Sequence, residues 1–124
     1  MNSNDVPFAL YGTLRRGGRL HRAYGIDRCL FMGSGIVEGF SLYVCRGESF
    51  PRASHSAIGS IRVELYMPTE SIASKVIAME RGAGYSLETA LAGLDDGQSM
   101  VVRLFTSPLP PSGFKEVPGG DWFS

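Results

Sequence analysis

Residues 57–82 read AIGSIRVELYM-PTE-SIASKVIAMERG, and the hydrophobic period changes within this stretch from that of a strand to that of a helix. Before Pro68, apolar residues alternate with residues that can face solvent, which is the period of a half-buried strand. After Pro68 the apolar residues recur with helical spacing, Thr69 is the predicted N-cap and Gly82 offers a C-terminal cap. The stretch therefore predicts a strand over residues 57–67 and a helix over residues 69–81.

The predicted helix carries a carboxyl group on its apolar face. With Ile72 set to zero and about 100° per residue, Glu80 falls at roughly 80°, inside the apolar stripe. That stripe consists of Ile72, Ala73, Val76, Ile77 and Met79. Glu80 also lies in the last turn, where the helix carries partial negative charge, and both burial and this charge raise the pKa of a carboxyl. The direction suits a general acid or base near neutral pH. The structural alternatives are a buried ion pair with an arginine and an early helix end that leaves Glu80 in water.

The composition indicates one globular domain over residues 1–124. Hydrophobic residues make up 44% and charged residues 19%, and the formal net charge is zero. A neutral chain argues against nucleic acid as a partner, because nucleic-acid binding needs a basic face. No apolar run of about 18 residues is present, and the N-terminus lacks a signal-peptide pattern, so we expect no membrane association and a cytoplasmic location. Cys29 and Cys45 are expected to be buried free thiols, and no Cys or His spacing predicts a metal.

Glycines and prolines divide the rest of the chain into short segments, as expected for strands joined by tight turns. We expect strands over residues 8–11, 36–44 and 100–105, the second with a bulge at Gly39, and a turn over 95–98. We also expect a helical turn over 20–24 and a separate apolar run over 29–32 that is ended by glycines. A loop is expected over 46–56, and a weak helix or turn over 86–93. The tail from residue 107 is expected to be irregular, with Trp122 and Phe123 packed against the rest of the domain. The sum is an α+β fold, a small curled mixed β-sheet or barrel of about five or six strands with one main helix.

The first predicted strand is followed by the loop Tyr11-Gly12-Thr13-Leu14. Gly12 can adopt backbone angles closed to other residues, and successive N–H groups in such a turn can converge on an anion. A carboxylate or phosphate could be held there without a lysine or arginine, although the same pattern occurs in many ordinary turns.

The other titratable and aromatic side chains are expected to have structural roles. Surface or solvated positions are expected for His21, His55, Glu48, Glu64 and Glu88, and core positions for Phe40 and Tyr43. Ser54 and His55 are adjacent in sequence, but no triad motif is present.

The ordered set of short motifs resembles the gamma-glutamylcyclotransferase-like superfamily from Phe8 to Trp122, nearly the whole chain. Each motif is weak alone, and the order and spacing make the set specific. The motifs are Tyr11-Gly12-Thr13-Leu14, Gly39-Phe40-Ser41-Leu42-Tyr43, Phe50-Pro51-Arg52-Ala53, Glu64-Leu65-Tyr66, Glu80 with Tyr85, and Gly120-Asp121-Trp122. The chain departs from the family pattern at Ile77, where the family often has Asp, and at Ser86, where an Arg often follows the tyrosine.

The resemblance implies the gamma-glutamylcyclotransferase-like fold and an enzyme that converts a gamma-glutamyl amine, amide or peptide to 5-oxoproline and a free amine. In this family the α-amine of the substrate attacks its own γ-carbonyl, so no enzyme nucleophile, metal or cofactor is implied. Glu80 would be the general acid/base, and Tyr85 would hydrogen-bond the substrate or Glu80. The backbone N–H groups of Tyr11, Gly12, Thr13 and Leu14 would hold the α-carboxylate.

Two other functions fit the same residues. One is a non-catalytic module of this fold that binds a small carboxylate or a protein. The other is a lyase-like deprotection of a gamma-glutamylated metabolite at the same site. The leaving amine, the source of oxyanion stabilisation and the oligomeric state do not follow from the sequence.

Overall fold

A computed structural model describes residues 6–123 of the chain. The strands are β1 (Phe8–Leu10), β2 (Leu30–Cys45), β3 (Arg52–Met67), β4 (Ser86–Leu94), β5 (Ser99–Thr106) and β6 (Phe114–Glu116). The α-helix is α1 (Glu70–Gly82), and short 3-10 helices occur at Ile26–Arg28 and Pro118–Gly120.

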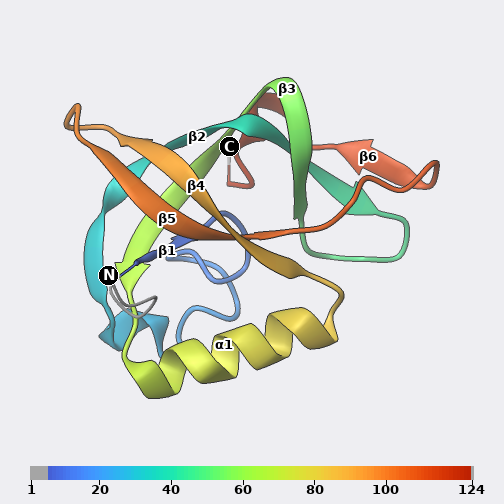
Figure 1. The fold of residues 1–124 in the computed structure, drawn as a ribbon. Coiled ribbons are helices and arrows are strands. Elements are labelled where there is room, and N and C mark those ends of the chain that lie inside the picture. The colour runs from blue at the N-terminus through green and yellow to red at the C-terminus, as the bar shows by residue number, and fades with distance from the viewer. Residues whose placement is uncertain (1–5, 124) are drawn as a thin grey trace.

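The strands form a closed mixed barrel with one added strand. The sheet order is β3-β1-β5-β4-β2-β6, and a further pairing between β2 and β3 closes the barrel so that β6 extends it from β2. The β1–β5 pair is parallel, and the pairs β1–β3, β2–β3, β2–β4, β2–β6 and β4–β5 are antiparallel. Figure 1 shows α1 as a separate layer that lies against the barrel. The expected α+β architecture with one main helix is therefore confirmed.

The barrel interior is filled by side chains that alternate along the strands. Those with no solvent exposure include Val37, Leu42, Ile61, Val63, Leu65, Val102 and Leu104. Tyr66 is an exception to the predicted alternation on β3, since it is only 2% exposed. The rings of Phe31 and His21 cover it, with centroids 5.3 and 5.6 Å away. A loop and a neighbouring strand therefore bury this outward-facing ring. Phe40 and Tyr43 belong to the core, as predicted.

Helix α1 follows the predicted helical wheel. Ala73, Val76 and Glu80 are its buried residues, and the Thr69 hydroxyl accepts a hydrogen bond from the backbone N–H of Ile72 as the predicted N-cap. The C-terminus differs from the prediction, because Gly82 is still helical and the left-handed residue is Gly84, with φ of +93°.

The helix ends in a Schellman motif. The N–H of Gly84 donates to the carbonyl oxygen of Arg81 at 3.1 Å, and the N–H of Tyr85 donates to that of Glu80 at 3.0 Å. A left-handed glycine is favoured in such a cap because it has no Cβ to clash with the backbone. The motif therefore brings the chain back at Tyr85 beside the last turn that carries Glu80.

Several expected element boundaries are wrong. Residues 30–45 form one strand, because bulges between Phe31 and Gly33 and between Glu38 and Phe40 absorb the glycines without ending the pairing. The bulge expected at Gly39 is confirmed. Strand β3 begins at Arg52, so the expected loop over 46–56 is wrong beyond Pro51. Residues 86–93 lie in β4 rather than in a helix or turn, because they pair with both β5 and β2.

The remaining segments depart less from expectation. Residues 20–24 form a hydrogen-bonded turn that precedes the 3-10 helix, and the expected turn over 95–98 is present. The tail is irregular apart from the short strand β6. Trp122 packs against the core, while Phe123 is 46% exposed and lies under the guanidinium of Arg15. Cys29 and Cys45 are free and partly rather than fully buried. Across residues 6–123, no helix has the length and apolar character needed to cross a membrane.

Candidate active site

A cavity of about 160 Å³ lies between β1 with the loop that follows it, the end of α1 and the loop before β3. Its lining includes residues 9–14, Phe50, Pro51, Met79, Glu80, Ala83, Tyr85 and Phe105. The predicted site residues Tyr11, Gly12, Thr13, Leu14, Glu80 and Tyr85 are thus brought to one cavity. The exposed side chain of Arg19, which belongs to none of the sequence motifs, also lines it.

Glu80 is a buried carboxyl without a protein partner. The residue is 9% exposed, and within residues 6–123 its side chain makes no hydrogen bond and no ion pair. Burial is the main cause that raises the pKa of Glu80, to about 7, and the charge of Arg52 acts in the opposite direction. Neither structural alternative applies, since the carboxyl is neither paired with an arginine nor free in bulk water. A carboxyl with such a pKa can accept and return a proton near neutral pH.

The loop after β1 also lines the cavity, and within residues 6–123 some of its backbone N–H groups have no acceptor. Among the described residues, no acceptor takes a hydrogen bond from the N–H of Gly12, Thr13 or Leu14. The carbonyls of Gly12 and Thr13 are engaged, since they accept from the N–H groups of Arg15 and Leu20 at 3.0 Å each. A loop with free donors and bonded acceptors favours an anionic ligand.

Gly12 is packed too closely for a side chain. A Cβ at this position would lie 2.7 Å from Pro51 Cγ and 2.9 Å from Pro51 Cδ. The Pro51 ring therefore limits how closely the loop after β1 approaches the start of β3. Gly12 and Pro51 both line the cavity, so this close contact lies in its wall.

The two tyrosines of the site use their hydroxyl groups to hold the cavity walls. The Tyr85 hydroxyl donates to the carbonyl oxygen of Pro51 at 2.7 Å, so it does not donate to Glu80. The Tyr11 hydroxyl donates to the carbonyl oxygen of Phe105 at 2.6 Å and accepts from the N–H of Ala53 at 3.2 Å. Burial raises the pKa of Tyr11 and of Tyr85, so both phenols are neutral near pH 7.

An ion-pair network holds the end of the loop after β1 against β3 and the C-terminal segment. Arg15 is 9% exposed and its Nε and Nη1 donate to Glu64 and Asp121 at 3.2 and 2.9 Å. Glu64 also accepts from the backbone N–H of Arg16 and from the Tyr66 hydroxyl, each at 2.9 Å. The expectation that Glu64 is solvated is therefore wrong, because a side chain far away in sequence reaches it.

The other side chains expected at the surface also have hydrogen-bond or ion-pair partners. Glu48 pairs with Arg52, which contradicts its predicted solvation. Glu88 accepts from Thr106 at 2.7 Å and pairs with the exposed His55, while His21 Nδ1 lies 2.8 Å from the carbonyl oxygen of Leu14. Neither histidine lines the cavity. At the two positions that depart from the family pattern, Ile77 packs against the core and Ser86 is exposed at the start of β4.

Within residues 6–123, a small closed barrel with one α-helix places an unpaired carboxyl in the same cavity lining as a loop whose backbone N–H groups lack acceptors. This combination defines a class of small barrel proteins with a ligand-binding or catalytic site. Within that class, the chain belongs to the gamma-glutamyl cyclotransferase, AIG2-like family, whose sequence model matches residues 8–124.

Relatives from archaea and mammals share the sequence or the fold. The chain is 34% identical over 83 residues to a protein of Pyrococcus horikoshii named "Putative gamma-glutamylcyclotransferase PH0828", covering 67% of this chain and 66% of the relative. The crystal structure of PH0828 superposes with a TM-score of 0.73 at 31% identity, over 94% of this chain and 88% of the other. An AIG2-like protein from Mus musculus shows the same fold, with a TM-score of 0.74 at 20% identity over 87% and 81% of the two chains.

Proposed function

We propose that this protein is a gamma-glutamylcyclotransferase-type enzyme that converts a gamma-glutamyl amine, amide or peptide to 5-oxoproline and a free amine. The observation that carries the proposal is the unpaired Glu80 carboxyl, which lines the same cavity as Gly12, Thr13 and Leu14, whose N–H groups have no acceptor within residues 6–123. Family membership supports the reaction class.

The reaction needs a base and an acid at one position. Glu80 removes a proton from the α-ammonium of the substrate, whose nitrogen then attacks the γ-carbonyl carbon of the same molecule. A new C–N bond closes the five-membered ring and the original γ C–N bond breaks. The departing nitrogen takes one proton from the Glu80 carboxyl as the γ C–N bond breaks, which returns Glu80 to its carboxylate. The new ring nitrogen gives up its remaining extra proton to the released amine, so the products are 5-oxoproline and an ammonium ion.

Orientation is the second contribution of the site. The substrate's α-carboxylate accepts hydrogen bonds from the free N–H groups after β1, which fixes the glutamyl chain with its amine near Glu80. Well-oriented intramolecular reactions gain roughly 7–11 kcal/mol over their bimolecular counterparts. Because this substrate already carries both reacting groups, holding one rotamer supplies the orientational part of that gain. The neutral Tyr85 phenol, whose proton is donated to Pro51, can still accept a hydrogen bond from the substrate's ammonium.

A substrate panel tests the proposal. The protein is incubated with gamma-glutamyl amino acids, amides and amines, including gamma-glutamyl-lysine, and 5-oxoproline is measured. We expect product from at least one substrate and a loss of at least about a hundredfold for Glu80→Gln. Glu70→Gln is the matched control, because Glu70 is exposed at the other end of the same helix and should leave the rate unchanged.

The outcomes separate the competing functions. A fully active Glu80→Gln variant would contradict the assignment. No product from any substrate, together with saturable binding of a small carboxylate, would favour a non-catalytic module of the same fold.

A further inference from the structure

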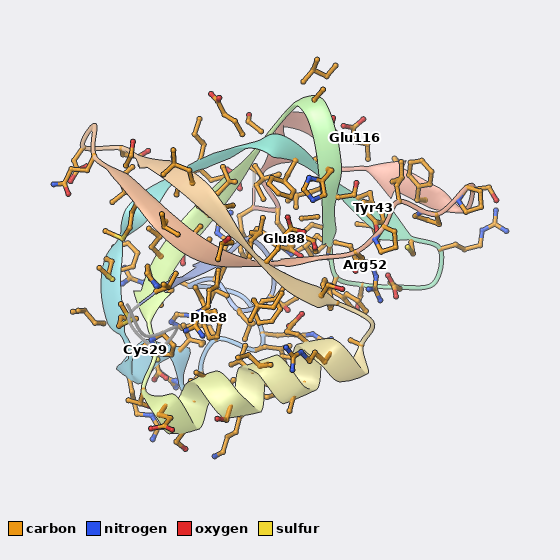
Figure 2. All side chains as sticks on the ribbon, in the orientation of Figure 1. Phe8, Cys29, Tyr43, Arg52, Glu88 and Glu116 are labelled. Atoms are coloured by element: carbon orange, nitrogen blue, oxygen red, sulfur yellow. The ribbon has the colours of Figure 1, made fainter. Side chains whose placement is uncertain are left out.

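Arg52 is a largely buried cation next to the cavity. It lies at the start of β3, and Figure 2 labels it near the loop that joins β2 to β3. Its side chain is 12% exposed, and Nε and Nη2 donate to the two carboxylate oxygens of Glu48 at 2.9 and 2.8 Å. Such a forked pair fixes the plane of the guanidinium as well as its position.

The remaining donors of Arg52 join two other segments. Nη2 donates to the carbonyl oxygen of Ala83 at 2.8 Å, and Nη1 donates to the Ser107 hydroxyl at 3.0 Å. Ala83 is the C-cap of α1, so Arg52 places a positive charge at the negative end of the helix. One side chain therefore ties the end of α1 to the segment that follows β5.

The guanidinium also lies over two aromatic rings of the cavity lining. Arg52 Cζ is 4.6 Å from the ring centroid of Tyr85 and 5.4 Å from that of Phe50. Cation–π contact at this range favours a defined ring orientation. The Tyr85 ring is thus held at its face by Arg52 and at its hydroxyl by Pro51.

We propose that Arg52 is a positioning residue of the Glu80 site, which holds the end of α1 and the Tyr85 ring in the arrangement that the cyclisation requires. The proposal rests on the proposed function, because it gives Arg52 a part in the same reaction. Arg52 does not line the cavity and acts through Tyr85 and the helix end.

The charge of Arg52 also reaches Glu80 through space. It lowers the pKa of Glu80 against the larger opposing effect of burial. Among the described residues, the other titratable groups that line the same cavity are Tyr11 and Tyr85, which are neutral near pH 7, and the exposed Arg19. Loss of the Arg52 charge would therefore leave Glu80 harder to ionise.

Three variants test the positioning role, with kcat and KM measured across pH on the substrate that the wild type turns over best. Arg52→Met removes the charge but keeps an apolar stem, and Arg52→Lys keeps the charge but loses the planar fork. Arg62→Met is the matched control, because Arg62 makes a forked pair with Asp95 outside the cavity. Circular dichroism checks that each variant is folded.

We expect Arg52→Met to lower kcat by up to about 100-fold and to move the acidic limb of kcat/KM to higher pH. Arg52→Lys should lower kcat while the limb stays near its wild-type position, and Arg62→Met should change neither. A merely structural role would lower stability in both Arg52 variants and leave the limb in place.

The opposite results overturn the inference. The inference fails if Arg52→Met is folded and its acidic limb of kcat/KM stays at the wild-type pH. It also fails if Arg52→Lys keeps the wild-type kcat. If Arg52→Met does not fold, the kcat of Arg52→Lys decides alone. If Glu80→Gln is inactive while the Arg52 variants behave like wild type, only the role of Arg52 is contradicted. If the wild type turns over no substrate, the proposed function is contradicted as well.

Discussion

The backbone N–H of Tyr85 donates a 3.0 Å hydrogen bond to the carbonyl oxygen of Glu80. Of the two hydrogen bonds that close the Schellman motif, this one joins the residues that are further apart in sequence. It holds the backbone of Tyr85 next to that of Glu80, the two residues whose side chains belong to the site. Many such motifs bring two apolar side chains together at these positions. Here the pair is a carboxyl and a phenol, so a common helix ending carries polar groups of the cavity.

Gly84→Ala should therefore damage both stability and activity. At φ of +93°, a Cβ is strained whatever space surrounds it, and we expect a loss of about 1–2 kcal/mol in the free energy of unfolding. Gly82→Ala is the control two residues earlier, where the backbone is helical and no atom lies within 4 Å of the added Cβ. It should be neutral or stabilising by up to about 1 kcal/mol in urea denaturation. Equal effects of the two substitutions would contradict the role of the cap.

The pH dependence of kcat/KM should report the ionisation of Glu80. Because the pKa of Glu80 is raised to about 7 and the base form starts the reaction, activity should rise with pH through this value and then level off. Steady-state rates on the best substrate between about pH 5 and pH 9 measure the limb. A limb near pH 4.5, the ordinary value for a glutamate, would show that the working carboxyl is not buried.

Glu80 should also make stability depend on pH. The pKa of Glu80 is about 7 in the folded chain against 4.5 for an ordinary glutamate, so the folded protein binds an extra proton between these values. The free energy of unfolding should fall as pH rises through this window, by roughly 3 kcal/mol at most. Glu80→Gln should remove this loss, so that it is more stable than the wild type at about pH 8 and similar at about pH 4. Urea titrations of both proteins at both pH values measure these free energies. The prediction would be contradicted if the wild type were more stable than Glu80→Gln at the higher pH.

Tyr85→Phe should destabilise the protein through Pro51. The substitution removes the 2.7 Å hydrogen bond and leaves the carbonyl oxygen of Pro51 without its donor. An unsatisfied buried acceptor costs about 1–3 kcal/mol. Tyr24→Phe is the control, since within residues 6–123 the Tyr24 hydroxyl makes no hydrogen bond, and it should stay within about 0.5 kcal/mol of wild type in thermal or urea unfolding.

The inward orientation of Glu80 could be predicted because it depends on a period that is local to one helix. The strand over residues 57–67 was predictable for the same reason. Strand β4 was not, since Ser86–Leu94 contains Leu, Glu and Ala, which favour helix, and its conformation comes from pairing with β5 and β2. Tertiary pairing outweighed local propensity there.

The polar connections behind the site could not be predicted from spacing. Arg15 and Glu64 are 49 residues apart, and Arg52 and Ala83 are 31 apart, yet each pair forms a hydrogen bond. Only the barrel topology brings them together. The motif Phe50-Pro51-Arg52-Ala53 contained the one available signal for Arg52, but it did not indicate that the side chain lies against Tyr85.

The parallel pairing of β1 with β5 sets when the cavity can form on a growing chain. Ala9 lies opposite Leu104, and the wall next to them includes Phe105, so the chain must be synthesised as far as residue 105 before this wall exists. Pairing between such distant segments is slow compared with helix formation. The helix that carries Glu80 precedes β5 in the chain, so its apolar stripe has no complete barrel to pack against until β5 has paired. Binding of a small ligand in the cavity therefore requires a chain in which β5 has already paired with β1.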